Sequence, residues 1–169
     1  MKKLLFTSLL LATIIFTSVA QNAKTPTRKK FSIGADVAVP TGIASMVYNI
    51  AIGGSIKYEL PATVDLDVTV SAGYEAFLVK SEFKIPGSKS AESYVPLKAG
   101  LKYYFKNGFF GEAEVGASIY TGSESFTSFV YAPGIGYTFE GGFETGVRYE
   151  AWVKNGTLGQ VALRLAYKF

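Results

Sequence analysis

The stretch VALRLAYKF, residues 161–169, decides the fold. Its side chains alternate strictly, with bulky apolar residues at odd positions and small or basic residues at even ones. Successive side chains of a β-strand point to opposite faces, so the pattern predicts a strand with one apolar and one polar face. The same alternation recurs upstream in seven further segments: residues 31–39, 50–60, 64–74, 94–105, 109–120, 129–139 and 143–153.

The composition indicates what kind of all-β protein these segments form. Of the 169 residues, 49% are hydrophobic and only 18% are charged, whereas a soluble domain usually carries more charge. Mean hydropathy is +0.23, yet beyond residue 20 no apolar run is long enough for a membrane helix. A transmembrane β-barrel reconciles these observations, because half of each strand is polar. We therefore predict an all-β fold, an eight-stranded antiparallel up-and-down transmembrane β-barrel.

The positions of the aromatic residues indicate which face of the strands points outward. A soluble lipocalin-like barrel buries its apolar face, whereas a membrane barrel turns that face to lipid. Aromatic residues of the apolar face gather near both ends of the strands, as interfacial belts do. One group is Tyr58, Tyr103, Phe105, Phe109, Tyr137, Phe139, Phe143, Tyr167 and Phe169; the other is Tyr74, Phe129, Tyr131 and Tyr149. We therefore predict that the apolar face contacts lipid and the polar face lines the lumen.

The polar face combines small residues with charged ones. The interior of an eight-stranded barrel is only wide enough for side chains, and a charge shut away from water is costly unless it is paired. We therefore predict a lumen plugged by ion pairs; a proton or ion path through the carboxylates is the alternative. The candidates are Asp36, Lys57, Glu59, Asp65, Asp67, Lys98, Lys102, Glu112, Glu114, Arg148, Glu150 and Arg164, with Glu144 and Lys168 on the same face.

The start of the chain predicts export. Residues 1–20 have a basic start, an apolar core and small residues before position 21, which is the pattern of a cleaved signal peptide. Residues 21–30 are polar and without period, so we expect a flexible periplasmic segment. The barrel then spans residues 31–169, and the expected location is a bacterial outer membrane.

Several function classes are disfavoured by what the sequence lacks. It contains neither Cys nor His, so a Ser-His-Asp site is impossible and the commonest zinc ligand is missing. The net charge of +4 is too weak to suggest nucleic acid. Asp65 and Asp67 share a face and raise the question of a metal, but we expect them to pair with Lys57 and Lys98. No catalytic, cofactor or metal site is predicted.

The connections between strands alternate in length, and the longer ones are the places to look for function. Short connections follow the second, fourth and sixth segments, as expected of periplasmic turns, and longer outer loops follow the first, third and fifth. The longer ones are candidate contacts for lipopolysaccharide or a surface partner, and a mobile solvated loop is the favoured interpretation of the longest. Candidate contacts are Lys80, Phe83, Lys84, Lys89, Met46 and Tyr48. Trp152 is predicted to cap the lumen near the outer rim unless a bulge turns it outward.

These features together resemble the OmpA/OmpX-type small outer-membrane barrels. The strand sequence LKYYFKNGFFGEAEVG, residues 101–116, is similar to the outer-membrane β-barrel domain family common in Bacteroidetes. The resemblance implies that the barrel assembly machinery reads the last strand through Leu165, Tyr167 and Phe169. It implies no single activity.

The leading hypothesis is a non-enzymatic, monomeric outer-membrane barrel with a structural or surface-interaction role through its outer loops. The alternatives are a narrow, porin-like channel or a carrier barrel for a small ligand or lipid, and a soluble calycin-like binder. Expected partners are outer-membrane lipid and lipopolysaccharide, with no cofactor and no nucleic acid.

Overall fold

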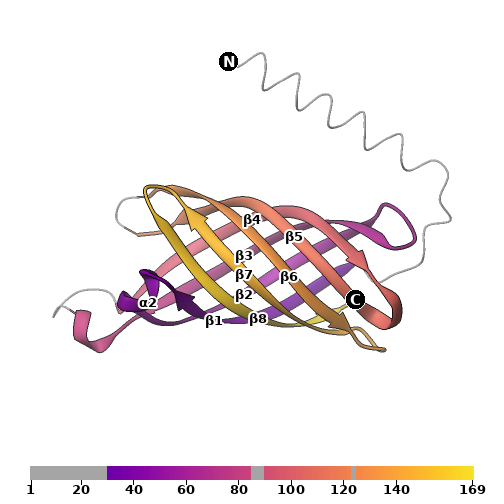
Figure 1. Cartoon of the computed structure of the whole chain (residues 1–169), viewed down its shortest axis with the longest axis horizontal. Coiled ribbons are helices and arrows are strands. Elements are labelled where there is room, and N and C mark those ends of the chain that lie inside the picture. Colours follow the sequence, from indigo (N-terminus) through magenta and orange to yellow (C-terminus); the bar gives the residue numbers. More distant parts are fainter. Residues whose placement is uncertain (1–29, 85–89, 123–124) are drawn as a thin grey trace, which may run out of the picture.

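The computed structural model describes residues 30–84, 90–122 and 125–169, which form a closed barrel of eight antiparallel strands (Figure 1). Each strand pairs with its neighbours in sequence, and β8 closes the barrel on β1. The predicted fold class is confirmed. The strands are β1 (Phe31–Thr41), β2 (Tyr48–Pro61), β3 (Leu66–Val79), β4 (Ala91–Tyr104), β5 (Phe109–Tyr120), β6 (Thr127–Thr138), β7 (Phe143–Val153) and β8 (Thr157–Lys168).

Three short turns lie at one end of the barrel, and the longer connections lie at the other end together with the short β7–β8 turn, residues 154–156 (Figure 1). We call these ends the short-turn end and the long-connection end. The short-turn end carries residues 62–65, 105–108 and 139–142, and includes η2 (Lys106–Gly108). Its tightest bends use glycine because φ is positive there, as at Gly108, Gly141 and Gly142. The long-connection end carries α2 (Ala44–Val47) and η1 (Ser81–Phe83).

Several strands extend further toward the long-connection end than the sequence predicted. The third segment was expected to end at Tyr74, but β3 continues to Val79. The alternation itself continues there, because Glu75 and Phe77 are buried while Ala76 and Leu78 are partly exposed. The β3–β4 connection therefore begins at residue 80 rather than 75. The predicted signal peptide, most of the segment 21–30 and Lys89 lie outside the described residues.

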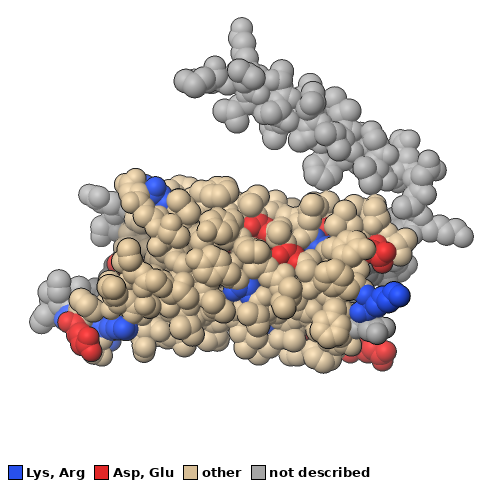
Figure 2. Space-filling model, viewed as in Figure 1, with Lys and Arg blue, Asp and Glu red and all other residues tan. Residues whose placement is uncertain are grey.

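The outer wall of the barrel is apolar over most of its height. Aliphatic side chains in the middle of the strands are widely exposed, for example Val37 at 46% and Ile135 at 70%. Figure 2 shows this wall as largely uncharged, with charged side chains gathered at the two ends and only a few visible between them. No helix among the described residues is long and apolar enough to cross a membrane.

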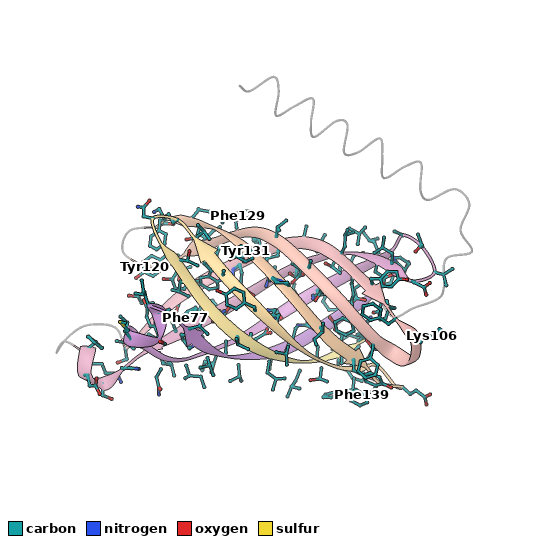
Figure 3. The ribbon with its side chains drawn as sticks, viewed as in Figure 1. Phe77, Lys106, Tyr120, Phe129, Tyr131 and Phe139 are labelled. Atoms are coloured by element: carbon teal, nitrogen blue, oxygen red, sulfur yellow. The ribbon has the colours of Figure 1, made fainter. Side chains whose placement is uncertain are left out.

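Aromatic side chains on this wall lie toward both ends. Phe139 lies at the short-turn end, where Lys106 also lies, whereas Phe129 and Tyr131 lie toward the long-connection end (Figure 3). Near the short turns the rings pack against one another, as Phe109 does against Tyr137 with centroids 4.8 Å apart. The arrangement follows the two groups predicted from the sequence and suits a wall with two polar–apolar interfaces.

Small residues inside the barrel make room for large side chains from other strands. A Cβ atom at Gly136 would overlap the ring of Phe110, and one at Gly34 would lie 2.9 Å from Cζ of Arg164. These glycines therefore permit close packing against side chains of the neighbouring strand rather than local backbone bending. The charged side chains of the lumen are positioned by this packing.

Candidate functional site

A buried network of charged side chains fills the lumen near the short-turn end. The ammonium of Lys102 lies 2.8 Å from a carboxylate oxygen of Glu59 and 2.6 Å from one of Glu144. Lys168 donates to the second oxygen of Glu59 at 2.6 Å, and the hydroxyl of Tyr104 donates to the same oxygen at 2.9 Å. Lys102 is fully buried, and its ammonium also lies 3.9 Å from the ring centroid of Phe110.

A second network occupies the middle of the lumen. Arg148 on β7 contacts Asp36 on β1 and Glu150 on its own strand, both at 2.8 Å. Lys98 on β4 contacts the same carboxylate of Glu150 at 2.8 Å. Because the Arg148–Asp36 and Lys98–Glu150 bonds join strands that are not neighbours in the sheet, they link separate parts of the barrel wall.

A fourth lysine links the middle of the lumen to β5. Lys57 on β2 donates to both carboxylate oxygens of Glu112 at 2.5 and 2.6 Å and lies 3.6 Å from Glu114. Glu114 also accepts a hydrogen bond from Ser71 at 2.9 Å. Opposite charges at these distances offset the cost of removing each charge from water, so the network is internally compensated.

An aromatic layer lies in the lumen at the long-connection end. Phe77, Tyr94 and Trp152 pack edge to face, with centroids 4.7 to 5.5 Å apart. The indole N–H of Trp152 donates to Glu150 at 2.7 Å, which joins this layer to the charged network below. Tyr48 packs against the other edge of Phe77 at 5.3 Å. The layer is therefore hydrogen-bonded to the charged network on its lumen side.

An open pocket of about 380 Å³ lies at the long-connection end beside this layer. We call it the outer cup. Its aromatic walls are Tyr48, Tyr94, Phe126 and Trp152. Its remaining walls come from α2 and the residue before it, from β6, from the β7–β8 turn and from the start of β8: Ile43, Ala44, Val47, Ser128, Lys154, Asn155, Gly156, Thr157 and Leu158.

The structure buries most of the predicted lumen residues inside the barrel, but one candidate, Asp65, lies elsewhere. Asp65 is exposed in the β2–β3 turn, whereas Asp67 is buried on β3, so these carboxylates do not share a face as predicted. The reason is that β3 starts at Leu66, and the alternation does not extend back to Asp65. Among the described residues no group of three acidic side chains is placed to hold a metal. Lys57 and Lys98 contact glutamates of β5 and β7 rather than the expected Asp65.

The expected loop contacts also divide. Met46 on α2 is exposed, as are Phe83 and Lys84 in the β3–β4 connection, and Lys80 is half-buried. Tyr48 is different: it is the first residue of β2 and turns into the aromatic layer, because the strand begins two residues earlier than predicted.

Sequence reasoning missed much of the aromatic layer. Phe77 lies beyond the end of the predicted segment 64–74, and Tyr120 is the last residue of the predicted segment 109–120. Both keep the inward parity of their segments. Glu75, which accepts a hydrogen bond from Gln160 at 2.7 Å, was assigned to a loop. The available signal was aromatic residues on the otherwise polar face near one end of the strands. Trp152 has the same parity and lies on the lumen face, as predicted, rather than being turned outward by a bulge.

Comparison with known proteins identifies the fold. No protein-family model matches the chain, and no curated protein matches it in sequence. Ail, the attachment invasion locus protein of Yersinia pestis, is similar in structure, with a TM-score of 0.59, 18% identity, and coverage of 83% of this chain and 97% of that one.

Two further solved structures give the same result. The N-terminal β-barrel domain of Pseudomonas aeruginosa OprF has a TM-score of 0.59 at 15% identity, covering 84% of this chain and 98% of that one. Neisserial surface protein A has a TM-score of 0.53 at 15% identity, covering 82% and 97%. The fold is thus that of the small OmpA/OmpX-type transmembrane barrels, as predicted. The resemblance to the Bacteroidetes-type family stays a prediction.

Proposed function

We propose that this chain is a non-enzymatic integral protein of a bacterial outer membrane, with its lumen closed by ion pairs and its long-connection end facing outward. The observation that carries the proposal is the polarity of the barrel. Ile33 and Ile135 are 52% and 70% exposed on the wall, whereas Glu59 and Lys102 inside are at most 1% exposed. Such a distribution suits a barrel surrounded by lipid, because a soluble protein rarely exposes so extensive an apolar surface.

The plugged lumen is the part of the proposal that excludes a channel. The lysine and arginine side chains cross the interior and contact carboxylates of other strands, and the aromatic layer lies above them. An ion passing through would have to separate these pairs in a space without bulk water. We therefore propose a structural or surface-interaction role rather than transport, and a chain without His or Cys suits a non-enzymatic role.

The experiment has two measurements on one preparation. The protein should be recovered with the outer-membrane fraction and, in detergent, should change its electrophoretic mobility when heated. The same protein in planar bilayers should give no steady ion-selective openings. Recovery as a folded protein in the soluble periplasm would refute the membrane assignment, and steady single-channel currents would refute the plugged lumen.

The outward end offers contacts for lipopolysaccharide. Lys84 is exposed in the β3–β4 connection beside the half-buried Lys80. Ail, whose fold is similar, has been crystallised with the heparin analogue sucrose octasulfate. Lysine ammonium groups attract anionic groups such as phosphate, so we propose that these lysines bind lipopolysaccharide phosphates. The double variant Lys80→Gln/Lys84→Gln should bind lipopolysaccharide vesicles more weakly than wild type, whereas Lys106→Gln at the short-turn end should not; equal binding by all three would contradict the proposal.

A further inference from the structure

The outer cup has a lining that points to a particular class of small ligand. Its volume of about 380 Å³ lies in the range of small-molecule sites, which span roughly 300–1,000 Å³. Ile43, Val47 and Leu158 supply aliphatic surface opposite the aromatic residues. A pocket this apolar favours a ligand with an alkyl or aryl body.

The aromatic walls are held in place by hydrogen bonds that lead away from the apolar lining. The hydroxyl of Tyr48 donates to Glu92 at 2.5 Å, and that of Tyr94 donates to the same oxygen at 3.3 Å. The indole N–H of Trp152 donates to Glu150. The polar atoms of these three side chains thus have partners within the barrel, so their rings form a preorganised surface that needs no rearrangement to receive a ligand.

Lys154 supplies the charge of the cup. It is the one charged residue among the described residues that line the pocket. Its ammonium lies 4.1 Å from the ring centroid of Phe126, and none of the described carboxylates lies within ion-pair distance of it. An exposed ammonium above an apolar pocket complements an anionic group at the end of an apolar body. Ser128, Asn155 and Thr157 add hydrogen-bonding groups to the lining.

We propose that the outer cup binds a small amphiphile with an alkyl or aryl body and a single anionic group. The body packs on Trp152 and Phe126, and the anionic group lies against Lys154. A single cation suits one negative charge rather than a polyanion, and the apolar walls disfavour a fully polar ligand. The site deepens the proposed surface-interaction role by naming a ligand class, and it depends on that proposal only for its exposure to the outside.

The chain offers its own probe of this site. Trp152 is the only tryptophan in the sequence and forms part of the cup, so its fluorescence reports on the pocket alone. The protein is placed in phosphatidylcholine nanodiscs at low salt and titrated with 4-phenylbutyrate, with its neutral analogue 4-phenylbutanol and with the cationic 4-phenylbutylamine. We expect a saturable fluorescence change with 4-phenylbutyrate. Its affinity should exceed that of 4-phenylbutanol by about tenfold and that of 4-phenylbutylamine by more.

Variants separate charge recognition from partition into the lipid. Lys154→Gln should reduce the affinity for 4-phenylbutyrate to that for 4-phenylbutanol, Lys154→Arg should retain the preference, and Lys106→Gln at the other end should leave both unchanged. Equal affinities for acid and alcohol in wild type, an undiminished preference in Lys154→Gln, or a change that never saturates would each overturn the proposal. Membrane insertion is scored separately by heat-dependent mobility, so failure of the cup is distinct from failure of the barrel assignment.

Discussion

Removal of the Lys102 ammonium tests whether the charged lumen stabilises the barrel. Lys102 is fully buried between Glu59 and Glu144, with ion-pair distances of 2.8 and 2.6 Å. Lys102→Met keeps the length and much of the volume of the side chain but leaves both carboxylates with one cation fewer. Breaking a buried pair from one side costs about 3–5 kcal/mol. With a urea m-value of about 2 kcal/mol/M, the unfolding midpoint should fall by roughly 1.5–2.5 M.

The assay is reversible urea unfolding in lipid vesicles, followed by tryptophan fluorescence and by heat-dependent mobility on gels. Lys106→Met is the matched control, because Lys106 is exposed in a turn at the same end of the barrel and should change the free energy of unfolding by at most about 0.5 kcal/mol. The double variant Lys102→Met/Glu144→Gln should lose less than the sum of the single variants, since the two side chains are in contact. A Lys102→Met midpoint equal to that of Lys106→Met would refute the reasoning.

Three further predictions concern the wall, the packing and the last strand. Val37→Lys places a charge on the exposed middle of β1 and should destabilise the protein by about 2–4 kcal/mol in lipid, whereas Val64→Lys in the β2–β3 turn should cost little; equal stability in urea titrations would contradict a lipid-facing wall. Gly136→Val should cost about 1–3 kcal/mol or more because its side chain meets the Phe110 ring, while Gly156→Ala, which faces open space, should be nearly neutral by the same titration. Phe169→Ala should lower the amount of barrel assembled in cells, yet leave the purified chain able to refold into vesicles; normal assembly in pulse-chase fractionation would argue against a recognition role for this residue.

The periodicity of the sequence was enough to predict the strands, and the positions of the aromatic residues were enough to predict their outward faces. From Phe31 to Val39 and again in residues 161–169, every expected lipid-facing residue lies on the outer wall. The prediction succeeds because each strand of a membrane barrel turns one face to lipid and the other to the lumen. Strand ends were less predictable, since residues 75–79 (EAFLV) place the aromatic Phe77 on the otherwise polar inner face and so interrupt the apolar–polar alternation of the sequence.

The partners within the lumen could not be predicted, because they depend on the tilt and stagger of the closed barrel. Asp36 and Arg148 are 112 positions apart and belong to strands that do not pair, yet their side chains meet at 2.8 Å. The outer cup could not be predicted for the same reason. It joins α2, Phe126 and the β7–β8 turn, which carry no shared sequence motif and become neighbours only when the sheet closes.

The pairing of β8 with β1 has a consequence for how the molecule matures. Ten consecutive residue pairs join these two strands, and the amide of Phe169 donates to the carbonyl of Phe31 at 2.7 Å. Until β8 arrives, β1 and β7 each present an unsatisfied row of backbone donors and acceptors, which invites pairing with another chain. We therefore expect the sheet to close only when the twelve-residue strand β8 is in place, and the chain to require a chaperone until then.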